Sequence, residues 1–278
     1  MKRAATDETP AVRVSLTVLT VLLLAMLLLL PLVMVFAQAL SGGWDAVTAT
    51  FAEPDARAAI ELTLLVAAVS VPLNSVCGLA AAWCIGRFDF PGRGLLVTLI
   101  ELPFSVSPVI SGLVWVLLFG ANGMLGSVLD RFGVRIVFAL PGLILATVFV
   151  TFPFVARTLI PLMQAQGATE EEAAITLGAS GWQTFWRVTL PNIRWGLLYG
   201  VLLCNARAMG EFGAVAVVSG HVRGQTMTMP LQVEALFNDY DWVGAFSIAA
   251  LLSLLALMTL VVKATLEWRI GRRGGALA

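Results

Sequence analysis

Two oppositely charged residues, Arg207 and Glu211, lie four positions apart inside a long apolar stretch of the chain. Residues at this spacing meet on one face of a helix, so the guanidinium and the carboxylate can neutralise each other. A charged side chain left unpaired at the centre of a bilayer costs about 2.5–3.5 kcal/mol on the insertion scale. The pair therefore predicts either a brace inside a helix bundle or part of a polar pathway or gate, with Asn205 as a third polar group nearby.

A second polar cluster consists of Ser105 and Ser107, which are flanked by Pro103 and Pro108. Proline removes a backbone donor and disturbs the helix around it, so hydroxyls and freed backbone groups can line a polar passage. A kink that only shapes the packing is the alternative interpretation, and the residues alone leave both open. The candidate pathway or gate residues are Ser105, Ser107, Asn205, Arg207 and Glu211.

The chain lacks the residue patterns of an enzyme. His221 is the one histidine, and no His-Glu-x-x-His sequence occurs, which argues against a zinc protease. Residues 178–181 match the Gly-x-Ser-Gly of intramembrane serine proteases, but we expect Ser180 and His221 on opposite sides of the membrane, beyond hydrogen-bond reach. No phosphate-binding loop of the type Gly-x-x-x-x-Gly-Lys-Ser/Thr occurs. We therefore expect no catalytic residue, metal site or cofactor in this chain.

The composition is that of a membrane protein. Of the 278 residues, 59% are hydrophobic and 12% charged, and the formal net charge is zero, which argues against a basic nucleic-acid-binding surface and against disorder. Runs long enough to cross about 30 Å of hydrocarbon predict an all-α polytopic protein with six transmembrane helices. The expected spans cover residues 14–36, 60–85, 95–119, 136–156, 196–218 and 243–262.

The basic residues predict the orientation of these spans. With a cytoplasmic N-terminus, twelve of the 17 Lys and Arg fall on the inside and four on the outside, which places both termini, residues 1–13 and 268–278, in the cytoplasm. The outside set is Arg57, Arg131, Arg135 and Arg223. Ala37-Gln38-Ala39 resembles a signal cleavage site, but the apolar run before it is longer than the 7–15 residues of a signal peptide. We therefore expect residues 14–36 to be an uncleaved first helix.

The loop expected at residues 157–195 predicts a pair of short helices at the cytoplasmic face. Thr169 is a good N-cap, and three glutamates at 170–172 suit the positive end of the helix dipole. Gly178 is placed to end this helix in the left-handed conformation. A second short helix is expected from Trp182 to a stop before Pro191. The residues alone are compatible with a membrane-surface hairpin or with a surface presented to a partner.

The spacing within this loop resembles the EAA loop of bacterial ABC importer permeases. Glu172-Ala173-Ala174 is followed by Gly178, Val188 where isoleucine is usual, and Leu190-Pro191. The resemblance implies a type I importer fold over residues 57–267 and a loop that docks into a separate ATPase subunit. The residues that it implies for coupling to the ATPase are Glu171, Glu172, Ala173, Ala174, Gly178, Ala179, Trp182, Leu190 and Pro191.

Three further segments resemble the W-type permease subunit of sulfate/thiosulfate importers: residues 102–108, 205–213 and 230–234. The resemblance implies import of sulfate or thiosulfate, with molybdate or tungstate as the alternative substrate. The five candidate pathway or gate residues all lie within the first two of these segments. A secondary transporter driven by an ion gradient is the competing class, but it leaves the cytoplasmic helix pair without a role.

The same resemblance implies the partners and the location. They are a second, homologous permease subunit forming a heterodimer, two ATPase subunits that hydrolyse the ATP, and a periplasmic binding protein, in the inner membrane of a bacterium. Gly196 and Gly200 would let another helix approach closely, and the resemblance assigns that helix to the second permease. Residues 228–241, with Pro230 at a helix start, are the candidate contact for the binding protein.

Overall fold

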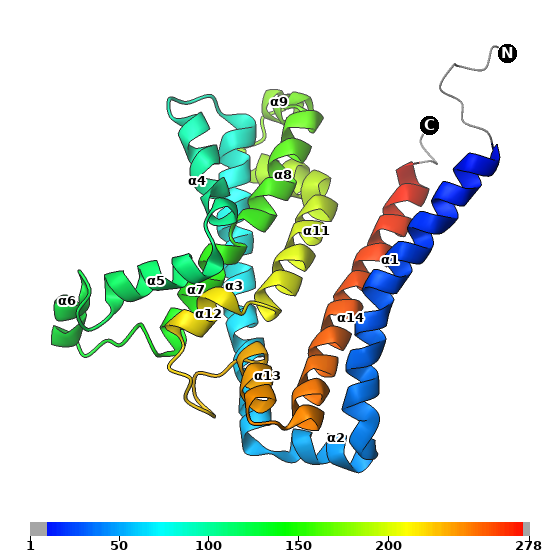
Figure 1. Ribbon diagram of the computed structural model, residues 1–278. Coiled ribbons are helices and arrows are strands. Elements are labelled where there is room, and N and C mark those ends of the chain that lie inside the picture. Colours follow the sequence, from blue (N-terminus) through cyan, green and yellow to red (C-terminus); the bar gives the residue numbers. More distant parts are fainter. Residues whose placement is uncertain (1–9, 275–278) are drawn as a thin grey trace.

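The structure is a computed structural model that describes residues 10–274, and every regular element in that range is a helix (Figure 1). The elements are α1 (Pro10–Ala39), η1 (Leu40–Gly42), α2 (Gly43–Ala52), α3 (Pro54–Arg87), α4 (Arg93–Ser105), α5 (Pro108–Phe119), α6 (Gly126–Arg131), α7 (Leu140–Thr151), α8 (Pro153–Gln166), α9 (Thr169–Thr176), α10 (Gly181–Thr184), η2 (Phe185–Thr189), α11 (Leu190–Met209), α12 (Gly213–Val218), α13 (Met229–Asn238) and α14 (Trp242–Gly274). The all-helical prediction is confirmed for this range.

Helix α3 is the centre of the bundle. Its buried residues contribute to separate apolar clusters with α7 and α12, with α8 and α11, and with α13 and α14. Near its middle, the Asn74 side chain donates hydrogen bonds to Thr151 Oγ1 (2.7 Å) and to the Val148 carbonyl (3.1 Å), both on α7. Near its beginning, Thr63 Oγ1 accepts a hydrogen bond of 2.8 Å from the backbone N–H of Met229, the first residue of α13. These bonds satisfy polar groups that would otherwise be costly in an apolar interior.

Four helical stretches in the described residues are long and apolar enough to cross a membrane, or five when α4 and α5 count as one broken span. The expected span at 95–119 is broken between these two helices, whose axes differ by 107°. The break follows from Pro108, which disfavours a helical conformation for the preceding residue; Ser107 has a ψ of 135°. Six membrane-spanning helices and cytoplasmic termini stay predictions.

The expected span at 196–218 is broken as well, because α11 ends at Met209 and α12 begins at Gly213. The two breaks meet. A Cβ atom at Gly213 would lie 3.0 Å from Pro108 Cβ, and a Cβ atom at Gly112 would lie 2.8 Å from the Ala214 carbonyl oxygen. Glycine is therefore required at Gly112 for α5 and α12 to cross this closely.

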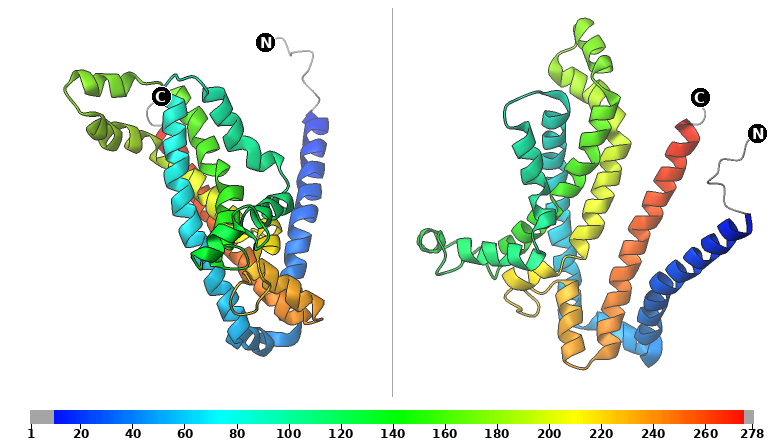
Figure 2. Two further views of the ribbon diagram at one scale, coloured as in Figure 1. Left: turned by 90° about the vertical axis from the view of Figure 1, so that its left-hand side faces the viewer. Right: turned by 45° about the horizontal axis from the view of Figure 1, so that its top comes forward.

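Helix α1 packs against α14 and stands away from the rest of the bundle in the views of Figure 2, whereas α14 also packs against α13 and α11. The most apolar window of the stretch that begins with α1 is entirely unburied within the chain. A helix that is apolar and unburied over this length is typical of a lipid-facing or partner-facing span. The beginning of α1 and the end of α14 point to the same end of the molecule as α9, whereas α2 and α13 lie at the opposite end (Figure 1).

The expected cytoplasmic loop is shorter than predicted, because α8 continues through its first ten residues to Gln166. The partner predicted for the glycines of α11 is also wrong. A Cβ atom at Gly196 would lie 2.3 Å from Leu162 Cδ2, and one at Gly200 would lie 3.2 Å from Val155 Cα. Leu162 and Val155 belong to α8 of the same chain, so this glycine face is already occupied and is not open to a second permease.

Candidate functional site

Helix α9 forms as the acidic first turn and the glycine stop predict, except at its first residue. Glu170, Glu171 and Glu172 occupy the first turn, and Gly178 follows the helix with a φ of 89°. The helix begins at Thr169 itself and its N-cap is Ala168, so the prediction of Thr169 as the N-cap is wrong. Three carboxylates at the N-terminus make a side-chain cap less necessary, because they already stabilise the positive end of the dipole.

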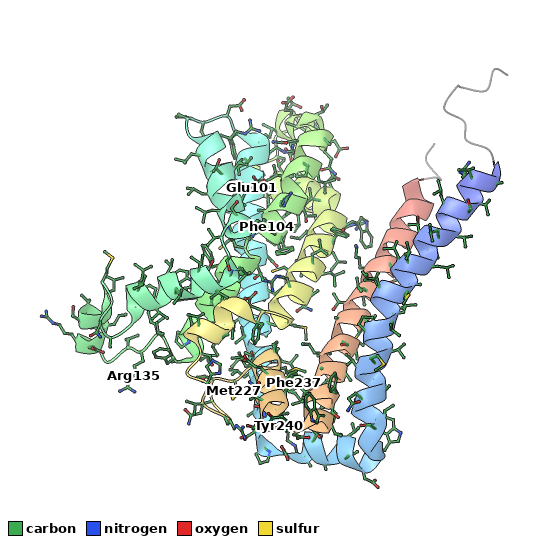
Figure 3. All side chains as sticks on the ribbon, in the orientation of Figure 1. Glu101, Phe104, Arg135, Met227, Phe237 and Tyr240 are labelled. Atoms are coloured by element: carbon green, nitrogen blue, oxygen red, sulfur yellow. The ribbon has the colours of Figure 1, made fainter. Side chains whose placement is uncertain are left out.

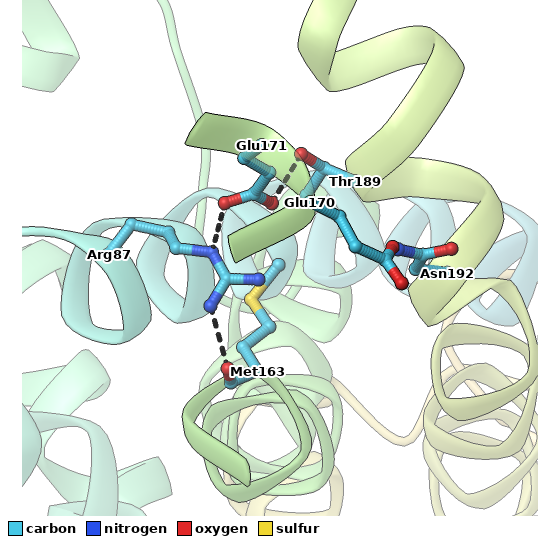
Figure 4. A network of polar contacts seen from close by, with 6 residues as sticks. All are labelled: Arg87, Met163, Glu170, Glu171, Thr189 and Asn192. Atoms are coloured by element: carbon cyan, nitrogen blue, oxygen red, sulfur yellow. Dashed lines mark hydrogen bonds and ion pairs between the residues drawn. The ribbon is translucent and has the colours of Figure 1, made fainter. Parts of the chain in front are cut away.

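Glu171 joins α9 to the membrane helices through a buried ion pair with Arg87, the last residue of α3 (Figure 4). Arg87 Nε lies 2.6 Å from Glu171 Oε2, and the two side chains are 8% and 13% exposed. Arg87 Nη1 also donates to the Met163 carbonyl of α8 at 2.7 Å, and Thr189 Oγ1 donates to Glu171 Oε1 at 2.6 Å. Four elements, α3, α8, α9 and η2, are therefore held at one point by an ion pair and two charge-assisted hydrogen bonds.

A second contact lies beside this ion pair. The Asn192 amide of α11 donates to Glu170 Oε2, and the Gln166 amide of α8 donates to the Asn192 carbonyl at 3.3 Å. These residues and Arg87 line one hollow between the helix ends. Arg87 was not predicted from the sequence to pair with the loop. The one available signal is its position in the last turn of a long helix, where a cation suits the negative end of the dipole.

The second short helix does not stop before Pro191. After α10, which begins with a capping box between Ser180 and Gln183, the chain passes through the π-helical turn η2 directly into α11, whose first turn contains Pro191. Proline within a helix lacks its N–H and clashes with the carbonyl four residues earlier. A π turn widens the helix at this place and removes the need for that hydrogen bond. The predicted stop is therefore wrong, and the helix pair continues into a membrane helix.

Aromatic side chains fix the helix pair from one side and leave an apolar surface on the other. Phe185 packs against Trp83 of α3, with ring centroids 5.2 Å apart, and against Trp182 and Trp186. Large apolar side chains are exposed on the helix pair, and we call this set the α9–α10 face: Ile175, Leu177, Trp182 and Trp186. Leu177 is 89% exposed. An exposed apolar patch of this kind is typical of a protein-interaction site.

The predicted coupling residues divide between this surface and the interior. Glu172, Ala173, Gly178, Trp182 and Pro191 are exposed, and Ala174, Ala179 and Leu190 are half-buried. Glu171 points inward to Arg87 and is not available to a partner.

The predicted ion pair between Arg207 and Glu211 forms, although the two residues do not share one helix. Arg207 Nη1 lies 2.6 Å from Glu211 Oε2, with Arg207 in the last turn of α11 and Glu211 in the break after it. The Glu211 side chain is fully buried, and its Oε1 accepts a 2.9 Å hydrogen bond from the Ala214 N–H at the start of α12. This carboxylate therefore neutralises Arg207 and caps α12 at once.

The other predicted pathway residues are only partly brought together. Ser107 precedes α5 at the break that meets Gly213, so it lies near the break that contains Glu211. Ser105 is exposed at the end of α4. Asn205 stays within α11, where its amide donates to Met209 Sδ at 3.5 Å. The two helix breaks, and not one cluster of side chains, are what the structure places side by side.

Several helices long and apolar enough to cross a membrane, two helix breaks that meet, and a helix pair fixed to one end of the bundle describe a polytopic membrane protein. Residues 74–270 match the family model of the binding-protein-dependent transport system inner membrane component, and the chain belongs to this family. The family resemblance expected from the EAA loop is thereby confirmed.

Relatives within the family narrow the comparison. The chain is 56% identical over 246 residues to the sulfate transport system permease protein CysW of Escherichia coli (strain K12), with 88% of this chain and 84% of that protein covered. It is 51% identical to CysW of Synechocystis sp. over 95% of this chain and 96% of that protein. It is also 36% identical to the sulfate transport system permease protein CysT of Escherichia coli (strain K12), over 91% of this chain and 92% of that protein.

Solved structures share the fold. A chain of a bacterial ABC transporter involved in the import of alginate superimposes with a TM-score of 0.73 at 18% identity, covering 94% of this chain and 95% of that chain. A chain of the alginate transporter in complex with its alginate-bound periplasmic protein gives a TM-score of 0.74 at 19% identity, covering 93% and 94%. At this identity the likeness concerns the fold, which is that of an ABC importer permease.

Proposed function

We propose that the chain is a permease subunit of an ATP-driven, binding-protein-dependent importer of sulfate or thiosulfate in the inner membrane of a bacterium. The observation that carries this proposal is the 56% identity, across most of the chain, to a relative described as a sulfate transport system permease. In this proposal the chain has six membrane-spanning helices with α9 and both termini on the cytoplasmic side. The core domain is residues 57–267.

The α9–α10 face docks on a separate ATPase subunit in this proposal. Its support is the pairing of an exposed apolar surface with a rigid attachment to α3 and α8 behind it. Glu172, Ala173, Ala174, Gly178, Ala179, Trp182, Leu190 and Pro191 take part in or shape the contact, whereas Glu171 transmits force to Arg87 from inside. The chain carries no phosphate-binding loop, so ATP is hydrolysed by the partner.

The chain forms half of the translocation pathway, and a homologous companion permease forms the other half. The 36% identity to a CysT protein, a second kind of sulfate permease, supports a heterodimer of related subunits. The two helix breaks with Ser105, Ser107, Asn205, Arg207 and Glu211 belong to the pathway or its gate. Helix α13, at the end of the molecule opposite α9, meets the periplasmic binding protein.

Reconstitution tests this proposal. The chain is assembled in lipid vesicles with a companion permease and an ATPase, and ATP hydrolysis is measured with binding protein loaded with sulfate, thiosulfate, molybdate or tungstate. We expect stimulation by the sulfate- or thiosulfate-loaded protein and uptake of the same ion. If only the molybdate- or tungstate-loaded protein stimulates hydrolysis, the substrate is that ion and not sulfate or thiosulfate. Uptake that needs an ion gradient but no ATP would contradict the assignment to the ATP-driven importers.

The docking surface has its own test. Leu177→Asp introduces a charge at the most exposed apolar position of the α9–α10 face, so we expect the ATPase to be lost from the purified complex. Leu125→Asp is the control, because Leu125 is also exposed but lies between α5 and α6, away from α9. Docking through this face is contradicted if the ATPase still copurifies with the Leu177→Asp complex. It is also contradicted if the ATPase is lost from the Leu125→Asp complex as well.

A further inference from the structure

Arg157 and Glu101 line a hollow between α8 and α4 that none of the predicted sites includes. Val97, Ile100, Ile160 and Pro161 complete the lining, and the hollow measures about 250 Å³. Both charged residues are exposed in the isolated chain. At about 30 Å³ for each water, this space can hold a small hydrated ion.

Both residues lie away from the ends of the membrane helices, part of the way along α4 and α8. Arg87 and Arg93, at the end of α3 and the start of α4, mark one end of the membrane helices. At a rise of about 1.5 Å per residue, Glu101 lies about 12 Å from the start of α4, and Arg157 lies about 9 Å along α8 from Met163, whose carbonyl Arg87 contacts. Charged residues at such a depth face protein or a water-filled cavity and not lipid.

Arg157 does not extend toward the nearby membrane surface. Its guanidinium lies over the Phe104 ring, 5.1 Å from the ring centroid. Phe104 is one turn beyond Glu101 on α4 and lies deeper, as Figure 3 shows by their order along α4 from the α9 end. A lysine or arginine without a polar partner in the bilayer extends its side chain so that the charged group reaches the membrane–water interface. Arg157 directs its charge toward the helix break instead.

The two charges are near each other without being paired. In the range 10–274 no ion pair joins Arg157 to Glu101, in contrast to the closed pairs of Arg87 and of Arg207. The cation–π contact with Phe104 holds the arginine without neutralising it. Ser105, four residues after Glu101 on α4, continues this face toward the break at Ser107.

We propose that Arg157, held over Phe104 and moderated by Glu101, is a transient binding site for the transported tetrahedral oxyanion. This inference rests on the proposed function and deepens it, because it assigns the anion contact to Arg157, while Arg207, already paired with Glu211, belongs to the helix break beside the pathway. A planar guanidinium binds two oxygens of such an anion at once. The nearby carboxylate keeps the site weak, and a pathway must release the ion that it binds.

The test uses the whole importer in phosphatidylcholine vesicles with sulfate-loaded binding protein. In Arg157→Gln we expect sulfate uptake per ATP hydrolysed to fall about tenfold, since a charge-assisted contact is lost, while subunit assembly and stimulated ATP hydrolysis persist. Arg157→Lys keeps the charge and should recover part of the uptake. Arg194→Gln is the matched control: Arg194 lies over the Trp195 ring on α11, 5.2 Å from its centroid, and its loss should leave uptake unchanged.

Direct binding adds a second readout. Glu101→Gln removes the moderating charge, so radiolabelled sulfate should bind the solubilised importer without binding protein, and Glu101→Gln with Arg157→Gln should abolish this binding. Uptake per ATP within twofold of the parent in Arg157→Gln, or failure to assemble in both Arg157 variants, overturns the inference. If Arg157→Gln lowers uptake only in vesicles that also contain anionic phospholipid, Arg157 binds a lipid headgroup, and the inference is overturned as well. If the parent importer itself transports neither sulfate nor thiosulfate, the proposed function fails instead.

Discussion

Arg87 and Glu171 stand 84 positions apart in the chain and meet at 2.6 Å, with both side chains almost completely buried. The contact joins the end of the central membrane helix to the first turn of the short helix that carries the exposed α9–α10 face. A displacement of that face is therefore transmitted to α3 through this ion pair. Hydrogen bonds to the Met163 carbonyl and from Thr189 hold the two charged side chains in place.

Arg87→Gln and Glu171→Gln should each lower the free energy of unfolding by about 3 kcal/mol, because either change leaves a buried charge without its partner. The double variant should lose less than the sum of the two. Thermal unfolding of the purified permease pair measures this. Asp89→Asn is the control: the pair between Asp89 and Arg93 is 2.7 Å long but solvated, and its loss should have almost no effect. Additive losses would contradict a direct pair.

Gly178→Pro should uncouple ATP hydrolysis from uptake, because proline cannot adopt a φ of 89° and lacks the N–H that donates to the Ile175 carbonyl. Gly178→Ala should cost about 1 kcal/mol for the left-handed conformation alone, since a Cβ atom there meets no neighbour. Gly181→Ala is the control, with equal space and no positive φ. Uptake per ATP hydrolysed is the measurement, and equal values for Gly178→Pro and Gly181→Ala would count against the geometry.

Glu172→Lys should also uncouple hydrolysis from uptake in the proposed importer. Glu172 is exposed in the first turn of α9, where a lysine reverses the charge and opposes the helix dipole. Because Glu172 makes no buried contact of the Glu171 kind, the subunits should still assemble. Normal uptake together with normal stimulated ATP hydrolysis would contradict the assignment of this position to coupling.

Arg207→Gln should be more damaging than Glu211→Gln. The first change leaves a fully buried carboxylate unpaired and costs about 3 kcal/mol. The second leaves an arginine that is 33% exposed, and the new amide oxygen can still accept from the Ala214 N–H, so about 1 kcal/mol is expected. Melting temperatures of the two variants decide the order. If Arg207→Ala alters neither stability, uptake nor stimulated ATP hydrolysis, the pair has neither a structural nor a pathway role.

Gly78→Ala should destabilise the bundle by about 1–3 kcal/mol through overpacking. The added Cβ atom would lie 2.8 Å from Val155 Cβ and 3.1 Å from the backbone nitrogen of Ala156, which cannot move aside as a flexible side chain could. Gly94→Ala serves for comparison, because its Cβ atom meets nothing and α4 should gain up to about 1 kcal/mol in helix propensity. Equal melting temperatures would show that α3 and α8 can separate without loss.

The residues that act on their own backbone were predictable from the sequence. Gly178 shows this: a glycine after three glutamates and a run of helix formers predicts a left-handed stop, and the φ of 89° confirms it. Pro103 and Pro108 marked the third span as irregular, and the chain does bend there by 107°. Local steric rules decide these features, so distant contacts are not needed to foresee them.

Features that depend on an uncommon local helix geometry or on contacts between distant segments were missed. The predicted stop before Pro191 is wrong because a π turn, a rare alternative to the α-helix, directly precedes the proline and lets the helix continue through it. In the sequence, Glu171 is one of three equivalent glutamates, and only the ion pair with the distant Arg87 distinguishes it from the other two. Gly196 and Gly200 do predict a close helix approach, but periodicity cannot tell a neighbour in the same chain from a separate subunit.

Helix α3 has consequences beyond packing, because it is bonded to α13 near its first turns through Thr63 and to α9 at its last residue through Arg87. At about 1.5 Å per residue, the stretch of α3 from Thr63 to Arg87 forms a rod of about 36 Å between these two contacts. If the binding protein and the ATPase dock at the two ends, their affinities are thermodynamically linked through this rod. Reciprocity then requires nucleotide state to change the hold on the binding protein by the same factor as binding-protein occupancy changes the hold on nucleotide.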